Sequence, residues 1–267
     1  TPPEQKLVKF SFVLTEVSGT QLFCTCLTFY EHQRISKDGK QEGNAVWVPK
    51  CICLVSHWPF FQQFSVFMEH IYNVFKNSSK TNGSFLPLER LLANFMFETP
   101  FPPRGRINVK VNLMEEGTGT KMKEVSFKRP APNKLPLRDF SLIHLFRLLS
   151  VENIVLVFSC ILNERRVLFV SNRVEDLCIA AETFKSLLFP MIWRHIYVPV
   201  VPEPLLERVC APFPYIMGVT EQAMPDQKLL DGVIQVELHQ NKVLQYEGGD
   251  EINSLTDKLQ ARLMKGL

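Results

Sequence analysis

The sequence predicts a mixed α/β protein of two lobes, an antiparallel sheet with helices followed by a parallel α/β lobe. Three observations lead to this prediction. The chain has 267 residues, more than the roughly 100–150 residues of a common domain. Its first part contains apolar, strand-like runs joined by short polar turns. Its second part alternates helix-like and strand-like segments, which is typical of a parallel sheet with crossover helices.

Strand signals open the first lobe. The runs Phe10–Leu14 and Gln21–Tyr30 flank Glu16–Gly19, and two apolar runs on either side of a short glycine-containing turn predict a β-hairpin. A third strand is expected at Val46–Val55. The polar residues 31–44 between the second and third strands are expected to form a loop.

A long helix is expected after the third strand. Pro59 suits the first turn of a helix, where its missing N–H would have no partner in any case. Apolar side chains then recur at three- and four-residue spacing, so they should share one face of the helix. They are Phe60, Phe64, Phe67, Met68, Ile71 and Phe75. A shorter helix is expected at Leu86–Phe97, after a break at Asn77–Ser84.

A proline-rich stretch divides the two lobes. The segment Thr99–Leu137 contains six prolines, and Ile107–Leu113 within it alternates apolar and polar residues as a strand does. We therefore expect a first lobe at 1–99, a connecting segment at 100–138 and an α/β lobe at 139–267.

The α/β lobe is predicted from four helix-like and four strand-like segments in alternation. The expected helices are 140–149, 151–162, 174–189 and 205–210, and the expected strands are 166–171, 195–201, 213–219 and 233–238.

Charge, apolar runs, cysteines and the absence of known motifs argue against several classes of protein. A net charge of +3 is too small to indicate nucleic-acid binding, and no apolar run approaches the roughly 20 residues of a membrane span. The seven cysteines are an odd number, and several lie in apolar runs, so reduced thiols in a cytosolic protein are expected. The phosphate-binding loop, the dinucleotide-binding glycine motif, the serine hydrolase elbow and the paired-histidine zinc motif are all absent.

One cysteine pattern could hold a metal. Cys24 and Cys26 are two residues apart, as are Cys51 and Cys53, and His32 and His57 lie near them in the sequence. Zinc ligands usually come from turns that wrap the metal, whereas these pairs lie in strand-like runs. Each pair should therefore share one sheet face and pack as small apolar residues. We expect no metal and no cofactor.

Several polar residues have two interpretations. His57, before Trp58, is either reactive or the border of a helix, and His195 is either functional or a hydrogen-bonding residue at the start of a strand. Arg165 and Arg166 follow Asn163 and Glu164 in a turn that either contacts an acidic partner or is simply solvated.

Ordered motifs along the chain resemble the DENN family. The similar stretches are Leu162–Phe169, Ser186–Pro190 followed by Trp193–Val200, Cys210–Val219 and, in the first lobe, Phe12–Thr15 and Cys51–Phe61. They span most of residues 8–240 in the family's order. The resemblance implies a longin-like first lobe and a flavodoxin-like second lobe. In the family a third, all-helical segment follows, of which only Asp250–Leu267 falls within this chain.

The resemblance also implies a partner, a Rab-family small GTPase, and an activity, the release of its GDP. Nucleotide exchange needs no covalent chemistry, so no catalytic residue is expected, and recruitment to membranes would follow from the GTPase. We expect the contact surface in the cleft between the lobes, although its aromatic residues could equally be core. The candidates are Asn163, Glu164, Arg165, Arg166, Trp193, Arg194, His195, Pro212, Tyr215, His57 and Trp58.

Two other functions remain open. Some distant relatives of the family are thought to activate GTP hydrolysis with an arginine finger, and Arg104 or Arg106 could be such a finger. Alternatively, the chain is a scaffold that binds a partner without catalysing exchange.

Overall fold

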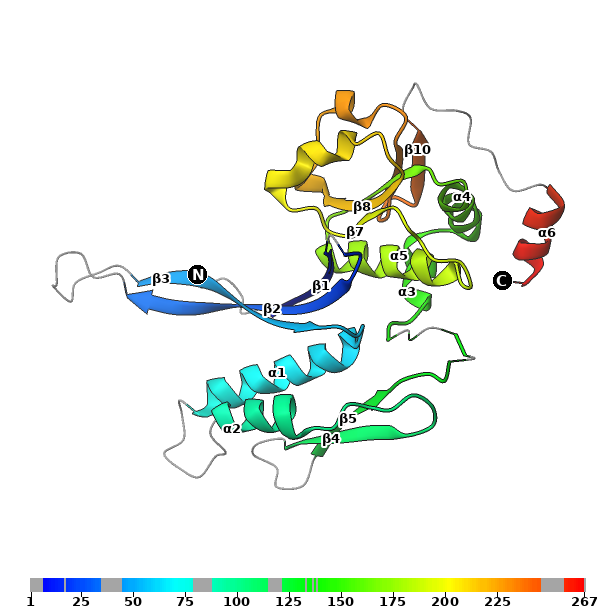
Figure 1. Ribbon diagram of the computed structural model, residues 1–267. Helices are drawn as coiled ribbons and strands as arrows, with labels where there is room; N and C mark the ends of the chain where they lie inside the picture. Colours follow the sequence, from blue (N-terminus) through cyan, green and yellow to red (C-terminus); the bar gives the residue numbers. More distant parts are fainter. Residues whose placement is uncertain are drawn as a thin grey trace. The chain divides into compact units, whose positions relative to one another are not determined.

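Two compact units make up the chain in the computed structural model (Figure 1). The structure describes residues 7–16, 18–34, 45–78, 88–114, 122–132, 134–135, 137, 139–245 and 257–266. The first unit consists of the described residues of Thr1–Phe10 and Cys24–Asp139, and the second of those of Ser11–Phe23 and Phe140–Leu267. The domain boundaries expected from the sequence stay a prediction. No helix in the described ranges is long and apolar enough to cross a membrane.

The three predicted N-terminal strands are confirmed and form a sheet of order β1-β2-β3. They are β1 (Val8–Thr15), β2 (Gln21–Arg34) and β3 (Ala45–Ser56). The amide of Glu16 donates to Thr20 O at 2.9 Å, and Gly19 supplies the positive φ of 83° that this turn requires. The loop predicted at 31–44 begins later than expected, because β2 continues to Arg34. Residues 35–44 lie outside the described part.

Aromatic side chains build the core of the first unit. Helix α1 (Phe61–Ser78) directs Phe64, Phe67 and Ile71 into it, as the sequence predicted, whereas Phe75, on the same face but near the end of the helix, is 44% exposed. The predicted second helix begins as α2 (Leu88–Ala93) and ends as the π-helical turn η1 (Asn94–Glu98). The break predicted at Asn77–Ser84 lies largely outside the described residues.

A hairpin completes this core. The predicted strand β4 (Asn108–Met114) pairs antiparallel with β5 (Met122–Lys128), which the sequence analysis missed. Leu113, Val125 and Phe127 are buried against the aromatic residues of α1. Part of the segment predicted to connect the lobes therefore supplies core side chains to the first unit.

The second unit contains the predicted parallel sheet, in the order β10-β9-β6-β8-β7. The strands are β6 (Arg166–Ser171), β7 (Ile196–Val198), β8 (Tyr215–Thr220), β9 (Ile234–Glu237) and β10 (Lys242–Gln245). Pairing is parallel from β9 through β6 and β8 to β7 and antiparallel between β9 and β10. Strands β6 and β8 are almost completely buried, as expected for a sheet covered on both faces.

Helices α3 (Ile143–Leu148), α4 (Val151–Leu162) and α5 (Val174–Leu187) were predicted with small errors at their ends. The segment expected to be helical at 205–210 is the 3₁₀ helix η2 (Glu203–Cys210). Two short 3₁₀ turns, η3 (Glu221–Ala223) and η4 (Gln227–Leu230), precede β9, and α6 (Asp257–Gly266) follows β10. Ser150 caps α4 by accepting a hydrogen bond from the amide of Asn153.

A buried carboxylate joins the hairpin end to the rest of the second unit. Glu182 of α5 is 5% exposed and accepts a hydrogen bond from the Tyr197 hydroxyl, and Lys185 forms an ion pair with it. Lys185 also donates to Gln21 Oε1 at 3.2 Å and lies 5.4 Å from the ring centre of Phe23. Burial first, and then the charge of Glu182, raises the pKa of Tyr197, so its hydroxyl stays protonated and donates.

Gly218 in β8 lets the segment after β7 approach the sheet. A Cβ at this position would lie 2.2 Å from the carbonyl oxygen of Pro199 and 3.2 Å from Leu177 Cβ. The amide of Val201 donates to Gly218 O at 2.8 Å, which holds the same segment in place. The sheet therefore requires glycine here because backbone, and not a flexible side chain, occupies the space.

Replacing Gly218 by alanine should lower the free energy of unfolding by about 2–4 kcal/mol, because backbone must move to admit the methyl group. Chemical denaturation measures the change. Gly19→Ala is the comparison, since Gly19 has open space around it and loses only about 1 kcal/mol from its left-handed backbone. Equal losses for the two variants would contradict the crowding at Gly218.

Asp139 caps the start of α1 from a distant part of the chain. Its Oδ2 accepts hydrogen bonds from the amides of Gln62 at 2.6 Å and Gln63 at 3.4 Å. Burial nevertheless dominates and raises the pKa of Asp139 to about 6, against the opposing effect of these hydrogen bonds.

A raised carboxyl pKa means that folding favours the protonated form, so Asp139 stabilises the fold most below about pH 4 and less as the pH rises through about 6. The variant Asp139→Asn keeps a side-chain acceptor at this position but cannot titrate. Relative to Asp139→Asn, the wild type should therefore lose on the order of 1–2 kcal/mol between these pH values. Unfolding curves of both proteins from pH 4 to pH 7 test this, and a relative gain with rising pH would contradict it.

Candidate functional site

Three predicted site segments meet at the amino ends of neighbouring parallel strands. In the register of the sheet, Arg166 of β6 and Ile196 of β7 both align with Tyr215 of β8. The residues just before these strands therefore lie at one edge of the sheet. We call Asn163–Arg166, Trp193–His195 and Pro212–Phe213 together the amino-edge surface.

Direct contacts tie two of these segments together. His195 Nε2 lies 3.1 Å from Glu164 Oε1, and the rings of Trp193 and His195 meet edge to face with centres 5.1 Å apart. The indole N–H of Trp193 donates to Ile196 O at 3.1 Å, so this ring is oriented by its own strand. Arg194 is exposed beside them.

The turn that carries Glu164 is strained. Asn163 caps α4, the amide of Glu164 donates to Ile161 O and that of Arg165 to Cys160 O. This is the Schellman pattern, whose left-handed residue is usually glycine. Here Glu164 has φ of 52° and a side chain that is 63% exposed. Backbone strain at an exposed charged residue often accompanies function.

Two predicted residues point inward instead. Tyr215 is fully buried, its hydroxyl donates to Val209 O at 2.9 Å, and burial is the main cause that raises its pKa. Arg166 is half-buried and donates to Asp231 O at 2.6 Å. Pro212, in contrast, is exposed.

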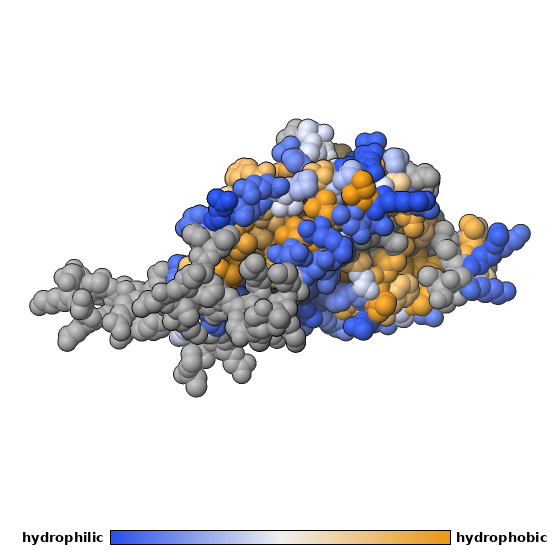
Figure 2. All heavy atoms as spheres, turned by 90° about the horizontal axis from the view of Figure 1, so that it is seen from below, coloured by the Kyte–Doolittle hydropathy of each residue, from blue (hydrophilic) through white to orange (hydrophobic). Residues whose placement is uncertain are grey.

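Apolar residues extend the amino-edge surface. Phe213 is 64% exposed and Ile192 is 70% exposed, next to Pro212 and Trp193 respectively. The view in Figure 2 shows that hydrophobic side chains open to solvent are interspersed with strongly hydrophilic ones on the face of the molecule seen there. Tryptophan and arginine are enriched in protein-binding hot spots, and neighbouring exposed apolar residues are a mark of interaction surfaces.

The first unit holds the other predicted residues. Trp58 is half-buried, and the guanidinium of Arg129 lies 3.8 Å from the centre of its ring and 4.7 Å from that of Phe101. Arg104 is joined to Arg129 by a β-bridge. We call Trp58, Phe101, Arg104 and Arg129 the arginine–aromatic cluster. His57 is exposed next to it in the sequence.

Like charges are close together in this cluster. Desolvation first, and then the charge of Arg104, lowers the pKa of Arg129, although an arginine remains protonated at neutral pH. Within the described ranges, no carboxylate forms an ion pair with Arg104, Arg106 or Arg129. Sequence reasoning missed Arg129, whose only signal was its place after an alternating apolar stretch.

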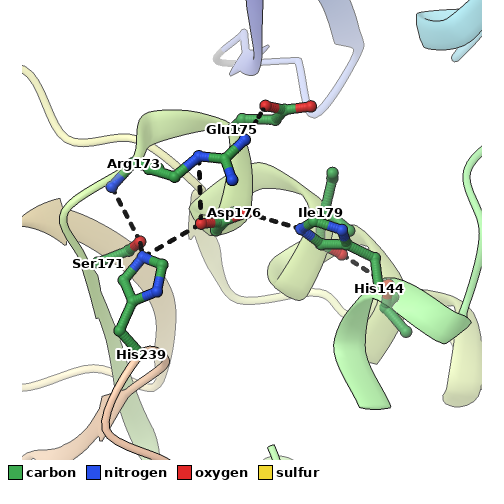
Figure 3. Close-up of polar contacts among 8 residues, drawn as sticks. His144, Ser171, Arg173, Glu175, Asp176, Ile179 and His239 are labelled. Carbon is green, nitrogen blue, oxygen red and sulfur yellow. Dashed lines mark hydrogen bonds and ion pairs between the residues drawn. The ribbon is translucent and has the colours of Figure 1, made fainter. Parts of the chain in front are cut away.

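A serine, a histidine and an aspartate also lie together in the second unit (Figure 3). His239 Nε2 is 2.9 Å from Ser171 Oγ and 3.2 Å from Asp176 Oδ2, and His144 Nε2 is 2.7 Å from Asp176 Oδ1. A catalytic histidine uses one nitrogen for the nucleophile and the other for the carboxylate, whereas His239 turns a single nitrogen toward both. Ser171 and Asp176 are also fully buried, so this group is structural.

The cysteines divide into two groups. Cys24 and Cys26 are buried, as the core interpretation predicted, but Cys51 and Cys53 are exposed on β3. The core interpretation is wrong for this second pair, whose side chains are open to solvent.

Comparisons with known proteins agree with the fold. The family model DENN (AEX-3) domain matches residues 47–241. The chain is 31% identical over 256 residues to DENN domain-containing protein 2A of Mus musculus, covering 95% of this chain and 23% of that protein. It is 33% identical over 265 residues to DENN domain-containing protein 2C of Homo sapiens, covering 98% and 26%.

A plant protein is similar as well. DENN domain and WD repeat-containing protein SCD1 of Arabidopsis thaliana is 30% identical over 237 residues, which cover 88% of this chain and 19% of that protein. The chain thus spans about a quarter or less of the length of these relatives. The family match covers far more than half of the chain and includes the whole amino-edge surface, so the chain belongs to the DENN domain family.

Proposed function

We propose that the chain binds a Rab-type small GTPase and accelerates the release of its GDP. The observation that best supports this is the assembly of the amino-edge surface, where three segments far apart in sequence meet. An exchange factor needs a broad surface that binds the nucleotide-free GTPase more tightly than the GDP-bound form. Each 1.4 kcal/mol of that difference weakens GDP binding about tenfold.

The location of this surface favours a protein over a small molecule. Ligands of open parallel sheets usually bind beyond the carboxyl ends of the strands, whereas the amino-edge surface lies at the opposite ends. Its exposed groups are the apolar Phe213 and Pro212 and the charged Arg194 and Glu164. Such a mixture suits a protein surface that carries both apolar and charged groups.

The strained turn gives Glu164 a particular role in the proposal. Its backbone conformation costs about 1 kcal/mol relative to glycine, so a purely structural turn would gain stability from glycine. We propose that Glu164 is kept for its carboxylate, which orients His195 and contacts the GTPase. Trp193, Arg194 and Pro212 supply neighbouring contacts, Asn163, Arg165 and Arg166 position the turn, and Tyr215 supports β8 from within.

His57 and Trp58 are proposed as contacts from the first unit. Trp58 is oriented by Arg129 and His57 is exposed, so the pair offers an aromatic and a titratable side chain. Recruitment to membranes would then follow from the bound Rab.

Replacing Glu164 by glycine should stabilise the chain by about 1 kcal/mol and slow exchange about tenfold, through loss of an interface contact. The measurements are chemical denaturation and the release of fluorescent GDP from a panel of Rab GTPases. Glu221→Gly is the matched control, because Glu221 is exposed in η3 outside the amino-edge surface. A Glu164→Gly protein with full exchange activity would contradict the proposed role.

A panel in which several Rab GTPases bind but none releases GDP faster would instead favour the scaffold interpretation. A panel with no binding at all would contradict both interpretations of this chain.

Activation of GTP hydrolysis is the second candidate function. It is favoured by the exposure of Arg104 and Arg106 on either side of Gly105, whose φ is 121°. A finger must be exposed and reach the transferring phosphoryl group.

The two functions differ in their response to Arg104→Ala and Arg106→Ala. Exchange activity predicts that neither variant changes GTP hydrolysis by a bound Rab. A finger predicts that one of them lowers hydrolysis by about 10³-fold while binding persists. Single-turnover hydrolysis measured beside a binding assay separates them, and Arg147→Ala, which removes an exposed arginine of α3, is the control.

A further inference from the structure

Four cysteines come together in the sheet of the first unit. Cys24 and Cys26 lie in β2, and Cys51 and Cys53 lie in the neighbouring strand β3. The ten residues 35–44 that separate the two strands are too few for the crossover of a dozen or more residues that a parallel pair needs. The two strands therefore run antiparallel.

Thiol contacts agree with this pairing. The Cys24 thiol interacts with Cys53, and the Cys26 thiol interacts with both Cys51 and Cys53. In an antiparallel pair, each step forward along one strand matches a step back along the other. Cys26–Cys53 is the directly facing pair that accounts for all three contacts, because Cys24–Cys53 and Cys26–Cys51 are then its two diagonal neighbours. The ion pair between Lys50 of β3 and Glu31 of β2 agrees, since these residues are also diagonal neighbours in this register.

The thiols of the two strands differ in exposure. Cys24 and Cys26 are buried, whereas Cys51 and Cys53 are exposed. Desolvation first, and then the proximity of Cys53, raises the pKa of Cys24 to about 11 and also raises that of Cys26. The buried thiols are therefore mostly protonated at neutral pH and react slowly with a peroxide, and an oxidant from solution reaches the exposed thiols first.

A metal does not account for the cluster. Among the described residues, no group of three or more histidine, cysteine, aspartate or glutamate side chains could hold a metal ion. Thiols spread along two adjacent strands do not surround a single point as zinc ligands do. A directly facing pair on antiparallel strands, in contrast, has a Cα separation that lies within the range of disulfides.

We propose that these cysteines are a redox modification site, at which a peroxide closes a reversible disulfide between β2 and β3. The thiolate of Cys51 or Cys53 attacks the peroxide, forms a sulfenic acid and releases water or an alcohol. The adjacent thiol, that of Cys26 facing Cys53 or that of a diagonal neighbour, then displaces water from the sulfenic sulfur and forms the S–S bond. Two thiols lose two electrons and two protons in total, and the peroxide is reduced.

The disulfide would link the edge strand β3 covalently to the central strand β2 of the sheet. Strand β3 is the last strand in the order β1-β2-β3, so its outer side has no sheet partner in that order. A disulfide to β2 would restrict the unfolded chain and hold this edge in place, and thiol reductants would reverse it.

Treatment of the whole chain with hydrogen peroxide tests the proposal. We expect a monomer whose intact mass falls by about 2 Da per bond and recovers after a reductant is added. Tryptic digestion without reductant should yield the peptide Phe10–Arg34 linked to the peptide Cys51–Lys76, since no lysine or arginine interrupts either peptide before its last residue. The linked protein should unfold at a temperature several degrees higher than the reduced protein.

The double variant Cys51→Ser/Cys53→Ser should abolish the linked peptides. Because both positions are exposed, it should fold normally, which circular dichroism checks. Cys210→Ser is the control, because Cys210 is exposed in η2 and its loss should leave the linkage unchanged. Absence of the linked peptides after full modification of Cys210 would overturn the proposal. Disulfide dimers through Cys51 or Cys53, or stoichiometric zinc lost in the double variant, would overturn it as well.

Discussion

The position of β7 depends on a buried negative charge. Glu182 is almost completely buried, and the desolvation of an isolated carboxylate at this position would cost several kcal/mol. The Tyr197 hydroxyl and the Lys185 ammonium remove that cost together. Because Tyr197 lies in β7, the same contacts hold the strand that Trp193, Arg194 and His195 precede. Lys185 also contacts Gln21 and Phe23, and Thr15 donates to Tyr197 O at 3.2 Å. One satisfied charge thus fixes both a strand of the sheet and the end of the first hairpin.

The amino-edge surface lies on a well-packed sheet, but its own backbone is strained at Glu164. The sheet beneath it is packed with continuous apolar strands, so the registers of Arg166, Tyr215 and Ile196 leave little freedom. Above them, Glu164 keeps a left-handed backbone that glycine would adopt at lower cost. A well-packed core can support such strain, and rigid scaffolds commonly carry binding residues on their loops. Stability below and strain above are the arrangement that the proposed binding role of this surface would require.

The charged groups Asp176 and Arg129 have different surroundings in the two units. Asp176 is fully buried and its oxygens contact His144, His239 and Arg173, so it is closed to substrates. Arg129 rests instead on the rings of Trp58 and Phe101, and the neighbouring Arg104 adds charge of the same sign. Cation–π contacts hold a guanidinium in place without neutralising it. The arginine–aromatic cluster therefore remains attractive to anionic groups, whereas the Asp176 group is not a reactive site.

The sequence by itself determined the element types of most of the chain, because periodicity reports which faces are buried. It predicted the strands of the first sheet, the face of α1 through Phe64, Phe67 and Ile71, and the parallel sheet with its helices. It missed β5, whose polar flanks hid its alternation, and it did not show that Phe75, on the same face of α1, is exposed. Only the tertiary structure decided which candidates meet: Glu164 with His195, and Trp58 with an unforeseen Arg129. It also decided that Tyr215 is buried and that Cys51 and Cys53 are exposed. The physical reason is that periodicity is a local property, whereas strand order, register and edge position arise from contacts between residues far apart in the chain.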